Sequence, residues 1–243
     1  MNQTKQMVRL IDTFQPEYLP KTDYMYNGYY VPRVTAILNR CIHTDSLMQW
    51  ANSLGFKRQS YTKTLEAAAS IGTECHESIE LFLSGKETDI ITNSSSMYAY
   101  ESFLKWWKLL HKYYNITVLL HEESLVCNYF GGTLDGLYQI NGKYYLVDYK
   151  TSNHITFKYC LQLAAYRYLL RILKGIEIDG CIILQLSKND IDYTEYILNF
   201  CNPNHLQFMI DCEQAFLSLV YAYYNIYKIE GNYKKIDWGD NYN

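Results

Sequence analysis

The chain has 243 residues, a formal net charge of −3, 49% hydrophobic and 19% charged residues, and only 4 Pro and 12 Gly. These values exclude a disordered or fibrous protein and suit a single domain with a substantial core. The slight acidity also excludes a broad basic surface that coats nucleic acid without specificity, although a local group of cations can still grip a phosphate.

Cysteine usage and hydropathy narrow the class further. The 7 Cys are an odd number, widely scattered and without a C-x-x-C pair, so we predict neither a disulfide framework nor a zinc ribbon and expect free thiols. No apolar run approaches the roughly 20 residues that span a bilayer, and the N-terminus, Met1–Gln6, lacks a signal-peptide core. We therefore expect no membrane association and a cytoplasmic location, in the host cytoplasm if the protein is viral.

The first half of the chain is predicted to be mainly helical. Residues 1–30 hold Pro16 and Pro20 and lack clean periodicity, which indicates an irregular N-terminal arm, and a short strand-like piece follows at Tyr29–Pro32. Apolar residues at helical spacing then predict a series of helices, with Gly85 as a stop signal. The first helix begins with Val34–Leu38, and the second begins with Leu47–Ala51 and ends near Gly55. The third runs over Tyr61–Leu83, and the fourth runs over Ser94–Tyr114.

The second half is predicted to mix strands with helices. The strands are Ile116–Val126, a hairpin around Leu137–Tyr145, Cys181–Leu186 and Tyr193–Leu198, and the helices are Thr156–Leu173, which ends at Gly175, and Pro203–Lys228. This order predicts an α/β fold in one domain, 31–230, with a mixed central sheet flanked by helices and a helical N-terminal part. A polar C-terminal tail, 231–243, is expected to lie over the surface.

The hairpin carries an unusual group of charges. Asn141-Gly142 is the strongest short signal for a hairpin turn, and a two-residue loop there places Asp135 directly opposite Asp148, with Cβ atoms roughly 4.5 to 5.5 Å apart. Because side chains alternate along a strand, Lys150 points to the same face as Asp148 and lies opposite Thr133. Two crowded carboxylates beside an amine predict a site for a cation.

Two pairs of residues with acidic or imidazole side chains precede this hairpin in the sequence. His76 and Glu80 are four residues apart on a predicted helix and share a face. Taken alone, His76 fits a hydrogen-bonded structural histidine. Glu122 and Glu123 lie on the strand before the hairpin and point to opposite faces, so one of them faces the site. We choose Glu123, although a pair of solvated acids explains the dipeptide equally well.

A further pair follows the hairpin. Gln162 and Tyr166 are four residues apart on the next predicted helix and therefore share a face. A Gln amide can orient a water or a phosphate, and a Tyr can contact backbone or base. An amphipathic helix alone also accounts for both residues.

Together these pieces resemble the RecB-like branch of the PD-(D/E)XK nuclease superfamily. The matching motifs occur in the family's order over about Val31–Leu173 and read G-x-x-x-H at Gly72–His76, a Glu, G-T-L-D at Gly132–Asp135, V-D-Y-K-T at Val147–Thr151 and Q-L-A-A-Y at Gln162–Tyr166. The segment Val31–Leu38 is also similar to the opening motif P-S-V-T-x-I-L of phage exonucleases and of mitochondrial genome maintenance exonuclease, with Arg33 in place of the usual Ser. The resemblance implies a restriction-endonuclease-like core.

The resemblance also implies roles for individual residues. His76, Asp135 and Asp148 match the metal ligands, with the Tyr149 carbonyl as a further ligand. Lys150 matches the catalytic lysine, which positions or activates the attacking water. Glu123 matches a less constant acidic position, and Gln162 and Tyr166 match the motif that contacts DNA. Some RecB-like nucleases bind an iron-sulfur cluster through Cys, but no tight Cys group occurs here, so we expect none.

The chemistry of these residue types agrees with that family. Carboxylate ligands suit Mg²⁺ or Mn²⁺, and a nearby lysine favours phosphodiester hydrolysis over the glycoside hydrolysis that paired carboxylates also perform. The sequence therefore predicts a metal-dependent DNA exonuclease, acting on single-stranded or frayed ends in recombination, replication or repair. The alternatives are a structure-specific or flap endonuclease on the same site, and a DNA-binding or protein-interaction module that does not cut.

Overall fold

The computed structural model describes residues 19–42, 45–87 and 90–235. The N-terminal arm is described only from residue 19, and it holds a small hairpin of β1 (Met25–Tyr26) and β2 (Tyr29–Tyr30). The rest of the predicted arm, residues 1–18, lies outside the described part. Within that part, none of the helices combines the length and apolar character needed to cross a bilayer.

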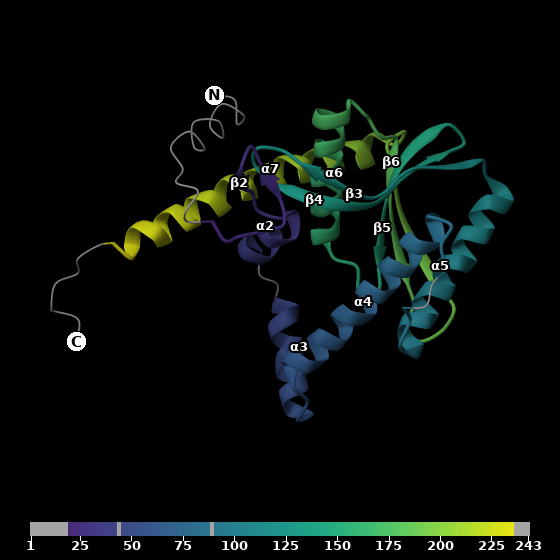
Figure 1. The fold of residues 1–243 in the computed structure, drawn as a ribbon, viewed down its shortest axis with the longest axis horizontal. Helices are drawn as coiled ribbons and strands as arrows, with labels where there is room; N and C mark the ends of the chain where they lie inside the picture. Colours follow the sequence, from purple (N-terminus) through teal and green to yellow (C-terminus); the bar gives the residue numbers. More distant parts are fainter. Residues whose placement is uncertain (1–18, 43–44, 88–89, 236–243) are drawn as a thin grey trace.

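A five-stranded mixed sheet forms the centre of the fold (Figure 1). Its spatial order is β3-β4-β5-β6-β7, with β5 and β6 parallel and the other neighbours antiparallel. The strands are β3 (Ile116–Val126), β4 (Gly131–Ile140), β5 (Lys143–Lys150), β6 (Gly180–Leu186) and β7 (Tyr193–Asn199). The predicted mixed α/β architecture is therefore confirmed, and it fits a restriction-endonuclease-like core.

Helices cover both faces of this sheet. The helices of the described part are α2 (Val34–Cys41), α3 (Asp45–Phe56), α4 (Tyr61–Leu83), α5 (Ser94–Tyr113), α6 (Phe157–Lys174) and α7 (Pro203–Tyr233), and all but α3 pack on the sheet. Local signals set several ends: the side chains of Ser60 and Asn93 cap α4 and α5, and Gly175 ends α6 in the left-handed conformation. In Figure 1, α3 and the first turns of α4 extend away from the sheet.

Two apolar clusters hold the layers together. One lies between the sheet and helices α2, α6 and α7, and includes Leu134, Leu146 and Phe216. The other lies between the sheet and helices α4 and α5, and includes Phe103 and Trp106. Because each cluster fixes one layer of helices on the strands, both α4 and α6 are held against the β4–β5 hairpin.

The predicted elements match the observed ones closely, and all seven cysteines are free. The final helix is the main difference, because α7 continues to Tyr233 rather than ending at Lys228. Nothing in its sequence interrupts it there except Gly231, which a helix tolerates near its end. Residues 231–233, predicted to belong to the polar tail, are therefore part of α7, and residues 236–243 lie outside the described part.

Candidate active site

The β4–β5 hairpin turns at Asn141 and Gly142, whose φ angles are 50° and 83°. Two successive positive φ values define the type I′ loop that the Asn-Gly dipeptide favours. The paired residues run from Ile140 with Lys143 to Gly136 with Val147, which is the predicted register. Asp135 and Asp148 are next in that register, and both are buried, at 8% and 1% exposure.

The strand pairing stops just before these two aspartates. Beyond Gly136 and Val147, the Asp135 Oδ2 atom accepts a hydrogen bond of 2.7 Å from the Tyr149 backbone N–H. A side-chain oxygen thus takes the place of a backbone acceptor. As a result, the Asp135 carboxylate is fixed to the backbone of β5.

Strand β3 brings a second carboxylate to this point. Glu122 has a φ of 45°, which is rare for a residue with a side chain, and its Oε1 lies 3.7 Å from His76 Nδ1. Glu123 instead pairs with Lys174 at 2.7 Å, away from the cluster. The choice of Glu123 is therefore corrected to Glu122. The reason is the register of β3 against β4: His121 lies opposite Gly136 and Glu123 opposite Leu134, so Glu122 lies level with Asp135.

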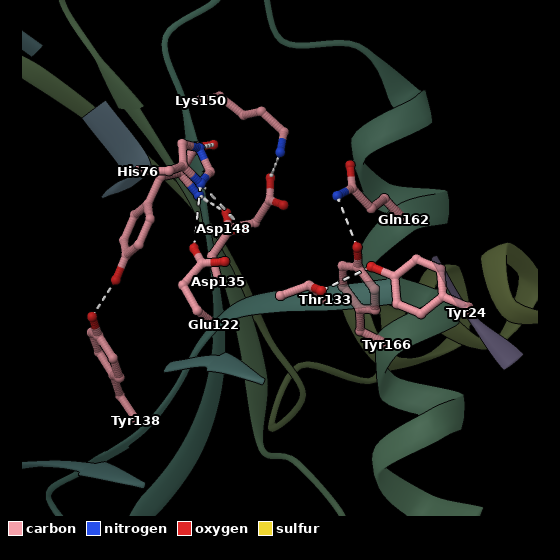
Figure 2. A network of polar contacts seen from close by, with 11 residues as sticks. Tyr24, His76, Glu122, Thr133, Asp135, Tyr138, Asp148, Lys150, Gln162 and Tyr166 are labelled. Carbon is pink, nitrogen blue, oxygen red and sulfur yellow. Dashed lines mark hydrogen bonds and ion pairs between the residues drawn. The ribbon is translucent and has the colours of Figure 1, made fainter. Parts of the chain in front are cut away.

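Helix α4 presents His76 to these acids (Figure 2). Its Nδ1 lies 3.5 Å from Asp135 Oδ1, and its Nε2 lies 3.1 Å from the Tyr149 carbonyl. Burial lowers the pKa of His76, but the Asp135 charge and the Glu122 carboxylate outweigh it and raise the pKa to about 9. At neutral pH His76 is therefore an imidazolium ion between two carboxylates. Glu80, which was predicted to lie on the same face of this helix as His76, is exposed.

Lys150 and Asp148 form the other half of the cluster. The Lys150 Nζ atom lies 2.6 Å from Asp148 Oδ2. Burial raises the pKa of the Asp148 carboxyl above its usual value, although the Lys150 charge opposes this. Burial lowers the pKa of Lys150, but Asp148 and Asp135 together raise it above the usual value. Lys150 is therefore held as an ammonium ion.

The donor set fits a divalent cation. Ligand atoms of His76, Glu122 and Asp135 all lie within 4.8 Å of one another. Nearby, Asp148 Oδ2 is paired with Lys150, while the buried Oδ1 of the same carboxylate has no hydrogen-bond donor among the described residues. A buried carboxylate oxygen without a donor favours a bound cation beside it, and oxygen ligands suit Mg²⁺ or Mn²⁺. His76 Nδ1, which faces the acids, is the nitrogen available to such an ion.

Gln162 and Tyr166 lie across the site on α6, as Figure 2 shows. They share a face as predicted, and Gln162 Nε2 donates to the Tyr166 hydroxyl at 3.3 Å. A Cβ on Gly132 would lie 2.7 Å from Tyr166 Cε1. Only glycine at this position lets the Tyr166 ring pack against β4, so the first residue of G-T-L-D has a steric role.

Thr133 and Tyr24 also belong to this side of the site. The Tyr24 hydroxyl and Thr133 Oγ1 are 2.8 Å apart, and the Tyr24 ring lies over Gly131. We placed Thr133 opposite Lys150 but gave it no role, and Tyr24 was not predicted at all. Thr133 is two residues from Asp135 on one strand, and this spacing was the available signal for it.

A pair of phenols supports β5 from behind the site. The hydroxyls of Tyr138 and Tyr149 are hydrogen-bonded to each other, and both side chains are almost fully buried. Burial raises the pKa of both hydroxyls, so they remain neutral. A Cβ on Gly136 would lie 2.9 Å from the Tyr138 ring, so this glycine makes room for the pair. The Tyr149 amide and carbonyl, which contact Asp135 and His76, are thereby anchored from the opposite face.

Comparisons with known proteins find similarity to solved structures only at low sequence identity. No family model matches it, and no curated protein matches it. Among solved structures, it is similar to SSO0001, with 14% identity, a TM-score of 0.29, and coverage of 59% of this chain and 73% of that one. It is also similar to LHK-Exo in complex with dAMP, with 15% identity, a TM-score of 0.32, and coverage of 70% and 92%. Likenesses this distant assign no activity.

Proposed function

We propose that this protein is a metal-dependent deoxyribonuclease, an exonuclease that acts on single-stranded or frayed DNA ends in recombination, replication or repair. The observation that carries the proposal is the gathering of Asp135, Asp148 and Lys150 at the end of one hairpin, with His76 and Glu122 facing them. The family resemblance of the five sequence motifs supports the DNA substrate and the exonuclease class.

His76 Nδ1, Glu122, Asp135 and Asp148 would hold Mg²⁺ or Mn²⁺, while the Tyr149 carbonyl, which the resemblance gave as a further ligand, accepts from His76 Nε2 on the other side of the ring. The ion, when bound, polarises a phosphate oxygen and lowers the pKa of a water. Glu122 takes the acidic position for which Glu123 was predicted. The Tyr149 backbone amide keeps the Asp135 carboxylate oriented toward the site.

Lys150 acts in this proposal as a fixed positive charge. Because its pKa is raised, it holds its proton at the pH of the cell and is a poor base. Its ammonium orients the attacking water by hydrogen bonding and offsets negative charge on the phosphate. Gln162 and Tyr166 contact the DNA strand next to that phosphate.

The test compares linear single-stranded, linear duplex and circular single-stranded DNA, each with Mg²⁺ or Mn²⁺ and with the Asp148→Ala variant as control. We expect the wild type to digest linear substrates, and neither the variant nor an EDTA-treated sample to do so. Cleavage of the circle indicates the endonuclease alternative. If no substrate is cut, the result favours the binding module, against which the complete set of charged residues argues.

A further inference from the structure

A cavity of about 330 Å³ opens at the carboxyl ends of the parallel strands β5 and β6, beneath the β6–β7 turn. Its volume is within the range of small-ligand sites. The wall is mainly neutral and able to form hydrogen bonds, from residues such as Ser152, Asn153, Asn189 and Thr194. The cavity suits a polar ligand.

The cavity is built on the same strand end as Lys150. Lys150 pairs with Gln185 across the β5–β6 ladder, and Gln185 is part of the cavity wall. Gln185 Nε2 donates to the Ser152 carbonyl at 2.7 Å and its Oε1 accepts from the Tyr196 hydroxyl at 3.3 Å. These bonds fix the chain just after Lys150, so the cavity has a fixed position relative to the candidate active site.

One cation in the cavity wall has no acidic partner. Lys188 is partly buried, burial alone lowers the pKa of its ammonium, and it forms no ion pair among the described residues. The two acids in the wall have partners other than Lys188: Asp192 pairs with Lys105 at 2.9 Å, and Asp190 accepts from Ser187, which also lines the cavity. A partly desolvated ammonium without a counter-ion favours an anionic ligand.

We propose that this cavity holds one nucleotide of the DNA strand beside the scissile phosphate, with Lys188 pairing with its phosphate group. The inference rests on the proposed nuclease function. The neutral polar wall then faces the sugar and the base, and the ring of Tyr193, which also lines the cavity, offers a surface for stacking. The same cavity would retain a released mononucleotide.

The test measures the Kd of 2′-deoxythymidine 5′-monophosphate by titration calorimetry in EDTA, so that no metal centre contributes. The variants are Lys188→Gln, which removes the charge, Lys188→Arg, which keeps it, and Thr194→Trp, which fills the cavity from an exposed strand position. Lys108→Gln is the matched control on exposed α5 surface, and Asp148→Asn is the control at the metal centre. Thermal unfolding checks that each variant is folded.

We expect Lys188→Gln and Thr194→Trp to weaken nucleotide binding about tenfold or more, while Lys188→Arg and both controls bind like the wild type. Equal Kd values for all variants would overturn the proposal. Loss of binding in Asp148→Asn but not in Lys188→Gln would also overturn it, because the nucleotide then sits at the metal centre. If the wild type cuts no DNA and Lys188 still controls nucleotide binding, the proposed function fails, its place beside a scissile phosphate fails with it, and the cavity remains a nucleotide-binding site.

Discussion

The Tyr149 backbone amide donates a hydrogen bond of 2.7 Å to the Asp135 carboxylate, immediately beyond the last paired residues of β4 and β5. The Asp135 side chain of β4 thus provides a hydrogen-bond acceptor for β5 at the point where the backbone pairing of the two strands stops. The carboxylate needed for the cation is therefore also part of the sheet. Its two functions can be separated by substitution, because an Asn side chain keeps the acceptor and loses the charge.

Asp135→Asn is expected to retain the fold and to reduce cleavage by more than about 100-fold. A residue that only supports a metal ligand contributes up to about that factor, and Asp135 is proposed as a direct ligand. Asp135→Ala should lose cleavage to the same extent and also destabilise the protein by about 1–3 kcal/mol, because the buried Tyr149 amide is left without an acceptor. Urea unfolding combined with a cleavage assay checks both. Equal stability of the two variants would contradict the role of Asp135 as an acceptor for β5.

The adjacent acids of β3 provide a matched pair of substitutions. Glu122→Gln should weaken Mn²⁺ binding and cleavage by at least about tenfold, because a ligand position facing His76 is neutralised. Glu123→Gln should leave both within about twofold, because it breaks only a partly exposed pair with Lys174 that contributes roughly 0 to 1 kcal/mol. Calorimetric titration with Mn²⁺ measures the difference. A larger effect at 123 than at 122 would reverse our assignment.

The β4–β5 hairpin and the acids of β3 show which features of the site could be predicted from the sequence and which could not. The register of β4 and β5 was predictable because the Asn-Gly turn sets which residues face each other, and every observed pair agrees. The choice between Glu122 and Glu123 was not predictable, because it depends on the register of β3 against β4, and the connection between them, Cys127–Phe130, carries no turn signal comparable to Asn-Gly.

Contacts between distant segments were equally inaccessible from sequence. Tyr24 meets Thr133 across a separation of 109 residues, and no local pattern in the N-terminal arm announces it. The helices, by contrast, carry their own caps, stop signals and apolar spacing, so most of their boundaries were predicted within a residue or two. Local chemistry therefore predicted the elements and the hairpin, and tertiary packing decided which extra residues reach the site.

His76 gives the metal-free protein a defined pH dependence. The pKa of His76 is about 9 in the folded state, above the roughly 6.5 of an unfolded chain. Its protonation therefore stabilises the fold fully below about pH 6.5, and this contribution is lost as the pH rises toward 9. The free energy of unfolding in EDTA should fall over this interval, and less so in His76→Asn. Exposed His154→Gln is the control and should follow the wild type.

Metal binding should show the opposite trend over the same interval. A bound ion requires the neutral imidazole, so the His76 proton must leave before Nδ1 can act as a ligand. Mn²⁺ affinity should therefore increase with pH up to about 9 and should release a proton. Calorimetry in buffers of different ionisation enthalpy counts that proton. Affinity that is independent of pH in the wild type would exclude His76 as a ligand.

Lys150 and Asp148 should behave as a coupled pair. Lys150→Met is expected to reduce cleavage by about 10² to 10³, the usual loss when one electrostatic donor is removed. It should also destabilise the fold, because the Asp148 carboxylate is left buried at 1% exposure without its cation. Adding Asp148→Asn should restore part of that stability. A double variant less stable than Lys150→Met would contradict the pairing.

Gly132 tests whether the packing of Tyr166 matters to the site. A Cβ at this position would lie 2.7 Å from Tyr166 Cε1 and 3.1 Å from Val34 Cγ2, so Gly132→Ala must displace the Tyr166 ring. We expect a loss of about 1 to 3 kcal/mol in stability, as for other overpacked cores, and a higher KM for DNA.

Gly72→Ala in α4 is the control, since its nearest neighbour, Thr151 Oγ1, is 3.6 Å away. That variant should be stabilised by roughly 0.5 to 1 kcal/mol, because Ala favours a helix over Gly. Steady-state kinetics and thermal unfolding of both variants separate the two effects. If Gly132→Ala raises KM no more than Gly72→Ala does, the position of Tyr166 does not influence DNA binding.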